Sequence, residues 1–444
     1  MSQAVEVEAD ALVPRHGDLS YGVEHYDLDL TWKHLGNHLS GRAVIDLVVE
    51  QPTRRLVLDL HALTVGKLSV QGARLAQWNH RQGRLVLKLG GDKLGSELAV
   101  GARVRVTVTY AGVPRPVPGP DGEAGWEELE DGVIVASQPH GAPSWFPCND
   151  RPSDKATYRI GLTVASGYTV VANGRLVEKR TASSRTTWVH VQDQPMATYL
   201  ATAQIGRYLS RPLAGSSVPV TIVHPARLTA AVAAGFARQV EMLEVFIRLF
   251  GRYPFDAYTV VVTDDDLEIP LESQGLSTFG ANDARTDWGA QRLIAHELSH
   301  QWFGNSLTLA HWRDIWLHEG FACYAEWLWS EESGGPSAAE QARRHWTRLQ
   351  AQPQDLVLAD PGPTELFDDR VYKRGALALQ AVRLTIGDPA FFALLRVWVA
   401  EHRYGSVTTA DFTAAAAAHS GVDLADLFRR WLHQPKLPAL PPAR

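Results

Sequence analysis

The chain of 444 residues is 45% hydrophobic and 21% charged, which excludes a disordered or fibrous protein and allows two or three domains. Its net charge of −6 includes no basic excess, so neither a nucleic acid nor an anionic membrane surface is indicated as a partner. The two cysteines are too few for a disulfide framework, so the fold must depend on its hydrophobic core.

Residues 1–20 predict an N-terminal extension. They contain Glu6, Glu8 and Asp10 and no apolar run, so they do not resemble a signal peptide. No stretch of about 18 consecutive apolar residues occurs, so we expect no transmembrane helix and no membrane insertion. The expected location is therefore the cytoplasm.

Residues 21–210 predict an antiparallel β domain with the form of a saddle or a sandwich. Tyr26, Leu28, Leu30 and Trp32 alternate with polar residues, which is the period of a half-buried strand. Short strands separated by turn residues are typical of this class of domain. Further strands are predicted at 43–49, 56–60, 84–89, 103–110, 133–137, 158–164 and 168–171, with a loop at 112–125.

Residues 211–444 predict a mainly helical domain that carries a small sheet, so the expected class is α+β with two domains. The Ala-rich segment 228–250 predicts one long helix, and 258–263 predicts a strand. The Pro-rich tail after Gln434 predicts a frayed end. Further helices are predicted at 291–302, 319–330, 337–349, 374–385, 391–401, 409–418 and 424–432.

One predicted helix carries the pattern H-E-x-x-H, formed by His296, Glu297 and His300. Residues four apart lie on the same face of a helix, so both imidazoles can reach one metal ion. Neutral imidazole nitrogens suit zinc, and Glu297 is placed to take a proton from a zinc-bound water. The pattern also arises by chance, so by itself it only suggests a metal site.

A third ligand is available in Glu319, which eighteen residues separate from His300. This gap allows a second helix to return a carboxylate to the same ion, and three protein ligands plus one open position are typical of catalytic zinc. A surface glutamate is the alternative interpretation of Glu319 taken alone. Together with the helical histidine pair, Glu319 predicts a site for one Zn²⁺ ion.

These residues resemble the gluzincin zinc aminopeptidases, the family of aminopeptidase N and leukotriene-A hydrolase. The resemblance extends from Ala295 through Asn305 to the Glu319 segment. It continues in the segments 146–152 (F-P-C-N-D-R-P), 195–200 (P-M-A-T-Y-L), 371–376 (V-Y-K-R-G-A) and 431–435 (W-L-H-Q-P). It implies a β-saddle domain followed by a thermolysin-like catalytic domain, in a short form that ends after the catalytic domain.

The resemblance also implies roles for residues outside the metal site. Tyr372 matches the tyrosine that donates a hydrogen bond to the oxyanion formed during the reaction. Glu272 matches the glutamate of the family pattern G-x-M-E-N, which binds the free amine of the peptide. Leu271 and Ser273 replace Met and Asn of that pattern, so they bear on which side chains are preferred. Gln138 matches a glutamine that the β domain contributes to the amine.

Two acidic residues close to the third ligand, Asp314 and Glu326, are candidates for orienting a ligand imidazole. The run Asp264-Asp265-Asp266 is better explained as a solvated loop than as a second metal site.

The sequence therefore predicts a zinc aminopeptidase that acts on peptides with a free N-terminus. Glu297 is the expected general base and Tyr372 the expected stabiliser of the oxyanion. One alternative is a zinc endopeptidase with an open cleft, because the segment around Glu272 departs from the family pattern. Others are a non-catalytic binding module of the same fold and, by family analogy alone, a lipid-epoxide hydrolase. A comparison of free with N-terminally blocked peptides separates the aminopeptidase from the endopeptidase.

Overall fold

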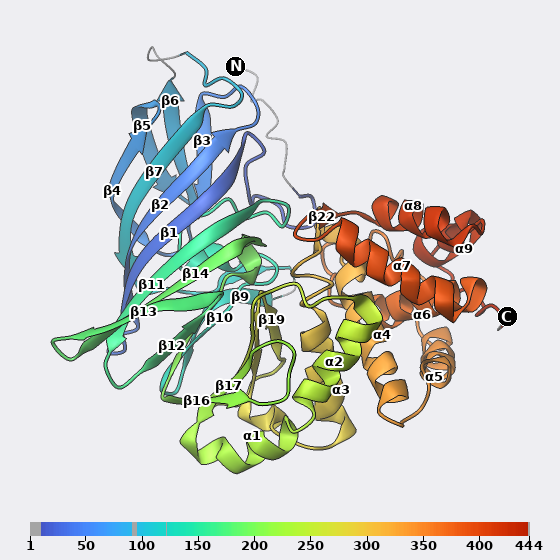
Figure 1. The fold of residues 1–444 in the computed structure, drawn as a ribbon. Coiled ribbons are helices and arrows are strands. Elements are labelled where there is room, and N and C mark those ends of the chain that lie inside the picture. The colour runs from blue at the N-terminus through green and yellow to red at the C-terminus, as the bar shows by residue number, and fades with distance from the viewer. Residues whose placement is uncertain (1–9, 91–95, 121, 443–444) are drawn as a thin grey trace. The chain divides into compact units, whose positions relative to one another are not determined.

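The structure is a computed structural model that describes residues 10–90, 96–120 and 122–442. The chain divides into two compact units, the first ending at Tyr208 and the second beginning at Leu209 (Figure 1). The predicted α+β class is confirmed, since β-sheets build the first unit and a small sheet with many helices builds the second. Of the predicted extension at 1–20, residues 1–9 lie outside the described residues. The remainder is packed, because Leu12 and Val13 are buried.

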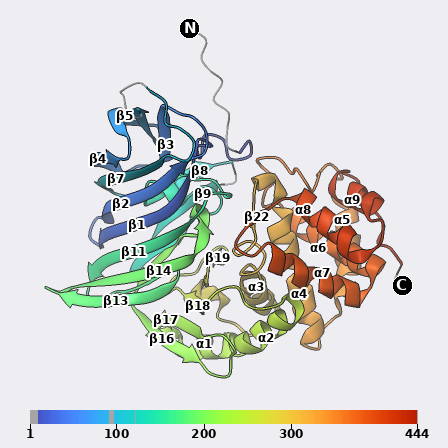
Figure 2. The ribbon, with the colours of Figure 1, turned by 45° about the horizontal axis from the view of Figure 1, so that its top comes forward.

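The first unit is built from strands that form three sheets within the described residues. The largest sheet has the order β13-β14-β11-β1-β2-β7-β4 (Figure 2). The other two have the orders β12-β15-β10-β9-β8 and β3-β6-β5. The strands are β1 (Tyr21–Lys33), β2 (His38–Val49), β3 (Arg55–Asp59), β4 (Thr64–Gln71), β5 (Arg74–Arg81), β6 (Arg84–Gly90), β7 (Arg103–Gly112), β8 (Val117–Gly119), β9 (Gly122–Leu129), β10 (Gly132–Ala136), β11 (Lys155–Ala165), β12 (Thr169–Ala172), β13 (Arg175–Ala182), β14 (Arg185–Ala197) and β15 (Ala203–Gly206).

Two expectations for the first unit are wrong. The sheets are not purely antiparallel, because β1 and β11 pair in parallel, with Tyr26 opposite Tyr158. A parallel pair joins segments far apart in the chain, and local alternation carries no signal for it. The predicted loop at 112–125 contains β8 and the start of β9, which form a hairpin.

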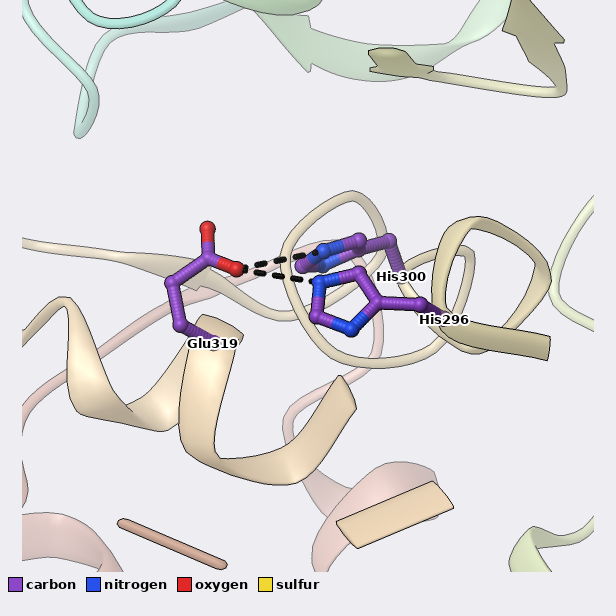
Figure 3. A group of neighbouring side chains, drawn as sticks. All are labelled: His296, His300 and Glu319. Carbon is purple, nitrogen blue, oxygen red and sulfur yellow. Dashed lines mark hydrogen bonds and ion pairs between the residues drawn. The ribbon is translucent and has the colours of Figure 1, made fainter. Parts of the chain in front are cut away.

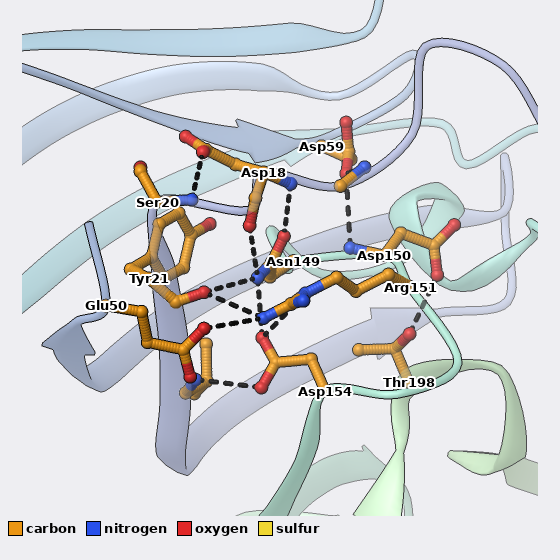
Figure 4. A network of polar contacts seen from close by, with 12 residues as sticks. Asp18, Ser20, Tyr21, Glu50, Asp59, Asn149, Asp150, Arg151, Asp154 and Thr198 are labelled. Atoms are coloured by element: carbon orange, nitrogen blue, oxygen red, sulfur yellow. Dashed lines mark hydrogen bonds and ion pairs between the residues drawn. The ribbon is translucent and has the colours of Figure 1, made fainter. Parts of the chain in front are cut away.

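The segment 146–152 makes polar contacts with distant parts of the first unit, most of them at least partly buried (Figure 4). The Asn149 side chain accepts a hydrogen bond from the Asp18 amide at 2.7 Å and donates one to Asp154 at 2.6 Å. Arg151 donates to the Tyr21 carbonyl at 3.0 Å and pairs with Glu50 at 3.3 Å. Arg151 replaces a family glutamate. Its contacts here require a hydrogen-bond donor, which a glutamate carboxylate is not.

The second unit contains the sheet β16-β17-β18-β20-β19 and the pair β21-β22 within the described residues. Helix α4 packs against α3 and α6, and α6 also contacts α5, α7 and α9. The strands are β16 (Tyr208–Leu213), β17 (Val220–Pro225), β18 (Tyr258–Val262), β19 (Leu271–Ser273), β20 (Leu276–Phe279), β21 (Thr308–Leu309) and β22 (Ser406–Val407). The helices are α1 (Thr229–Gly235), α2 (Gln239–Phe250), α3 (Trp288–Ser299), α4 (Trp316–Glu332), α5 (Ala338–Gln350), α6 (Asp369–Ile386), α7 (Asp388–Glu401), α8 (Thr409–Ser420) and α9 (Ala425–Leu432).

The single helix predicted at 228–250 is wrong, because the chain breaks between α1 and α2. Gly235 ends α1 where a Cβ would lie 3.0 Å from the Ala284 backbone. Phe236 then turns into the core and meets Phe279 edge to face, with ring centroids 5.2 Å apart. Tertiary packing of Phe236 therefore overrides the helical periodicity of the segment.

The expected frayed end after Gln434 is also wrong for the residues described. The Arg374 guanidinium donates to the Trp431 carbonyl at 3.0 Å and to the Pro435 carbonyl at 2.6 Å. The Trp346 indole donates to the Pro438 carbonyl at 2.7 Å, and Leu437 is buried.

In the described part of the chain, none of the helices is long and apolar enough to span a bilayer.

Candidate metal centre and active site

Helix α3 places the two histidines of the H-E-x-x-H pattern. It begins after Asp287, whose carboxylate accepts a hydrogen bond from the Ala290 amide at 3.2 Å and caps the helix. Ile294 and Leu298 are buried and fix the rotation of the helix against the core. His296 lies in the last turn, and His300 follows at the C-cap in helical conformation, so both rings project from one face.

Helix α4 brings the carboxylate of Glu319 to both imidazoles (Figure 3). Glu319 Oε2 lies 3.2 Å from His296 Nε2 and 3.5 Å from His300 Nε2. These side chains are buried, and their ligand atoms lie within 4.8 Å of one another, so they can hold a metal ion. The spacing that the sequence indicated therefore does bring the three predicted ligands together.

The outer nitrogen of each imidazole is held by an acceptor. His296 Nδ1 donates to Glu326 Oε1 at 2.8 Å, and His300 Nδ1 donates to the Phe303 carbonyl at 3.0 Å. Because a carboxylate and a carbonyl only accept, each Nδ1 carries hydrogen, and each Nε2 is the nitrogen that can bind a metal once it has lost its own proton. The donor set therefore fits a divalent ion such as zinc.

Of the two acidic candidates for this orienting role, Glu326 makes the contact and Asp314 does not. Asp314 Oδ1 instead accepts hydrogen bonds from the Thr409 amide at 3.0 Å and from the Thr409 hydroxyl at 2.5 Å. It ties the start of α8 to the segment before α4. The Phe303 carbonyl was missed, since a backbone acceptor leaves no residue-type signal in the sequence.

The electrostatics of the site favour a bound cation. Burial acts to lower the pKa of His296, but hydrogen bonds with Glu319 and Glu326 prevail and raise that pKa to about 10. Burial likewise acts against the charged form of Glu319, yet His300 and His296 hold its pKa well below the usual value. Burial also acts to lower the pKa of His300, but Glu272 and Glu319 raise it to about 9, so without a metal the protonated imidazoles supply positive charge. A divalent cation can take the place of these protons and release them.

Two further carboxylates lie beside the ligands. Atoms of Glu272, Glu297 and His300 that could bind a metal lie within 4.8 Å of one another. Burial, opposed by His296 and His300, raises the pKa of Glu297 to about 8, and burial also raises the pKa of Glu272. Glu297 Oε2 and Glu272 Oε1 are buried without a hydrogen-bond partner among the described residues. Buried carboxylates without partners are costly, so both are expected to meet a ligand.

The segment that carries Glu272 is clamped by residues that follow the histidine pair. Gln301 Nε2 donates to the Ser273 carbonyl at 3.1 Å, and Gln301 Oε1 accepts from the Gly275 amide at 2.8 Å. Asn305 Nδ2 donates to the same Ser273 carbonyl at 3.0 Å. This role of Gln301 and Asn305 was not predicted, since both residues belong to the segment of family resemblance and carry no further signal in the sequence.

Tyr372 lies in the first turn of α6 and contacts the metal centre. Its ring stacks against His296, with centroids 5.9 Å apart and an interplanar angle of 23°. Burial raises the pKa of Tyr372 well above the usual value, and Glu319, Glu272 and Glu297 add to this. The hydroxyl therefore stays protonated and can donate a hydrogen bond, and it makes none to a described residue. Gln138 belongs to the first unit, just after β10, and its role stays a prediction.

The chain resembles known proteins in both units. Residues 122–200 match the peptidase M1 N-terminal domain, and residues 235–431 match the peptidase family M1 domain. Aminopeptidase 2 of Candida albicans is 24% identical over 92% of this chain and 46% of that protein. Glutamyl aminopeptidase of Bos taurus is 28% identical over 68% of this chain and 34% of that protein. The chain thus spans about half or less of the length of these curated relatives.

Solved structures match over nearly the whole chain. The M1 zinc metallopeptidase of Deinococcus radiodurans is 31% identical with a TM-score of 0.88, over 98% of this chain and 100% of that one. A mutant of the Deinococcus protein, bound to a Tyr-Ser-Ala substrate, matches with the same identity and TM-score. Together with the two domain matches, this similarity shows that the chain belongs to peptidase family M1.

Proposed function

We propose that this protein is a zinc-dependent aminopeptidase that releases N-terminal residues from peptides. The observation that carries the proposal is the buried Glu272 carboxylate, which has an oxygen without a partner and lies beside Glu297 and His300. A free α-amine is an ammonium group, and a charge-assisted hydrogen bond to a buried carboxylate would hold it next to the metal centre. Relatives named as aminopeptidases support the same activity.

His296, His300 and Glu319 would hold one zinc ion, with Glu326 and the Phe303 carbonyl fixing the rings. When bound, zinc supplies Lewis acidity toward the attacking water and the peptide carbonyl. Two imidazole nitrogens and one carboxylate oxygen would leave a coordination position of the ion open for the reaction.

Glu297 would act as the general base. Its Oε2 has no partner among the described residues, so it is free to take a proton from the attacking water. Burial raises the pKa of Glu297, and this favours a carboxylate that holds the proton and then passes it to the leaving amine.

Tyr372 would stabilise the oxyanion that forms when water attacks the carbonyl. Its protonated hydroxyl beside His296 is a donor in a buried site, where a hydrogen bond to developing charge has its largest effect. Leu271 and Ser273 flank Glu272 on β19 and would influence which N-terminal side chain is preferred. A role of Gln138 at the peptide amine rests on the family resemblance alone.

The test compares free and N-terminally acetylated peptides of the same sequence. An aminopeptidase cleaves the free peptide and releases its first residue, whereas an endopeptidase cleaves both at comparable rates. Replacing Glu272 by Gln removes the charge that binds the amine, so kcat/KM for free peptides should fall roughly 10- to 100-fold. Glu268→Gln is the matched control, because Glu268 is an exposed acid in the preceding loop.

The general base is tested separately with Glu297→Gln. We expect kcat to fall about 10²- to 10⁴-fold while the purified variant still contains one zinc ion per chain. A chelator should abolish the activity of the unaltered protein, and added zinc should restore it. Undiminished turnover by Glu297→Gln would contradict the mechanism.

A further inference from the structure

A cavity of about 660 Å³ lies in the second unit, outside the metal centre. Its walls come from α3, α4, α5 and α6, and include Trp288, Arg292, Glu326, Arg344, Arg348 and Lys373. The Trp288 side chain is 42% exposed, which is high for the largest apolar residue type. The cavity therefore combines an accessible aromatic wall with several cations.

The charges in the cavity favour an anionic ligand. Arg292 pairs with Glu326 at 3.4 Å, and Lys373 pairs with Asp369 at 3.5 Å. The other lining cations, Arg344 and Arg348, form no ion pair with a described residue. They lie one turn apart on α5 and face the same cavity. After the two pairs are formed, two guanidinium groups remain for a ligand.

The cavity adjoins the metal centre through Glu326. This carboxylate lines the cavity, and its Oε1 accepts the hydrogen bond from His296 Nδ1 at 2.8 Å. Arg292 lies one turn before His296 on α3, and Lys373 directly follows Tyr372 on α6. The cavity therefore adjoins the His296 side of the centre.

Glu272 lies next to His300 and Glu297, and it does not line the cavity. If Glu272 holds the amine and the first peptide carbonyl lies at the metal, the rest of the peptide must continue away from Glu272. Of the two ligand histidines, His300 belongs to the group with Glu272 and His296 does not, and His296 adjoins the cavity through Glu326. In that arrangement the part of the substrate after the cleaved bond would run toward the cavity that Arg344 and Arg348 line.

We propose that Arg344 and Arg348 bind a carboxylate of the substrate downstream of the cleaved bond. This inference rests on the proposed aminopeptidase function and specifies its substrates as short or acidic peptides. The carboxylate is either the C-terminus of a short peptide or an acidic side chain near the cleaved bond. Guanidinium groups suit both, because they bind carboxylates through paired hydrogen bonds. The exposed indole of Trp288 offers an apolar surface to the peptide between its two ends.

The test measures kcat/KM on pairs of tripeptides and tetrapeptides that share a Leu N-terminus. One pair compares Leu-Ala-Ala as the free acid with its C-terminal amide. A second pair compares Glu with Gln at the second and third positions of amidated peptides. We expect the protein to prefer the charged member of at least one pair about three- to tenfold, mainly through KM, and this preference should shrink as salt rises.

The double variant Arg344→Gln/Arg348→Gln should bring the ratio within each pair close to one. Because the ratio is taken within one variant, a general change in activity cancels. Arg343→Gln is the matched control, since Arg343 is exposed on the same helix and does not line the cavity, and it should keep the preference.

The outcomes separate the two sources of the carboxylate. A preference confined to the first pair identifies the peptide C-terminus, and one confined to the second identifies an acidic side chain. Equal rates for all pairs, or a preference that survives in the double variant, overturn the inference. If leucine anilide is still hydrolysed in that case, the proposed function stands. Failure to turn over any free-amine substrate overturns the proposed function instead.

Discussion

Gly320 and Gly375 mark the point where α4 and α6 cross with their backbones in contact. A Cβ on Gly375 would lie 2.6 Å from the Gly320 Cα, and a Cβ on Gly320 would lie 2.7 Å from the Gly375 Cα. Glu319 directly precedes the first glycine, and Tyr372 lies one helical turn before the second. The close crossing therefore sets the position of the metal-ligand carboxylate relative to the tyrosine.

Gly375→Ala should weaken both the fold and the activity. Alanine gains about 1 kcal/mol of helix propensity over glycine, but its Cβ would force the two backbones about 1 Å apart. Overpacking of this kind costs about 1–3 kcal/mol, and here neither partner atom belongs to a side chain that could move aside. Urea unfolding should show a net loss of stability, and kcat/KM should fall because Glu319 and Tyr372 separate. Gly66→Ala in β4 is the control, because the atom nearest to its Cβ would be a side-chain hydroxyl, that of Thr109 at 3.3 Å, and not a backbone atom.

Tyr372→Phe should lower kcat about 10²- to 10³-fold with little change in KM. The hydroxyl makes no hydrogen bond to a described residue, so its loss should leave the ring stacked on His296 and the zinc content unchanged. Steady-state kinetics and metal analysis check this. Tyr404→Phe removes a hydroxyl that donates to the Pro254 carbonyl and should leave kcat unaltered. A variant of Tyr372 with normal kcat would exclude an oxyanion role.

Glu326→Gln should weaken zinc binding about 10- to 100-fold, because the neutral amide polarises the His296 ring less than the carboxylate does. Competition against a chelator of known affinity measures the change. Glu332→Gln is the matched control on α4, since Glu332 pairs with Arg248 at the surface, 2.6 Å away. Equal zinc affinity in both variants would show that the contact with His296 does not tune the metal.

The stability of the first unit should fall in acid because of His190. This residue is 5% exposed on β14, and burial lowers the pKa of its imidazole to about 4. The folded chain therefore favours the neutral ring, so its stabilising contribution is complete above the unfolded pKa of about 6.5 and is lost as the pH falls toward 4. The loss amounts to about 3 kcal/mol at most.

His190→Leu should remove this part of the pH dependence. Urea unfolding between pH 7.5 and 4.5 gives the free energy of unfolding of the variant and of the unaltered protein. The difference between them should change by a few kcal/mol across this range, and the titration of the metal ligands cancels in it. The exposed residue His433 serves as the control. A constant difference would contradict the assignment.

Much of the metal centre could be predicted from the sequence because its signals are local. His296 and His300 lie on one helix, so their spacing alone fixes that they face the same way. The prediction of Glu319 as a ligand required only that a second helix return to the histidine pair. The family resemblance supported the roles of Tyr372 and Glu272. The helices after residue 290 were also anticipated, since each carries a clear periodicity and stop signals.

The rest depended on contacts between distant segments. The parallel pairing of β1 with β11, the break at Phe236 and the anchoring of the tail by Arg374 are tertiary events that no local pattern encodes. The Phe303 carbonyl acts through its backbone, so its residue type is irrelevant. The cavity beside Glu326 arises from four helices, and none of them separately predicts it.

The clamp on Ser273 has a consequence for how this site can change over evolutionary time. Gln301 and Asn305 grip the backbone at Ser273 and Gly275 rather than any side chain. The location of Glu272 therefore depends on the backbone and not on the side chains at positions 271 and 273, so those side chains can change the preferred substrate without moving Glu272. The sequence of this segment can therefore change substantially while the carboxylate of Glu272 keeps its position.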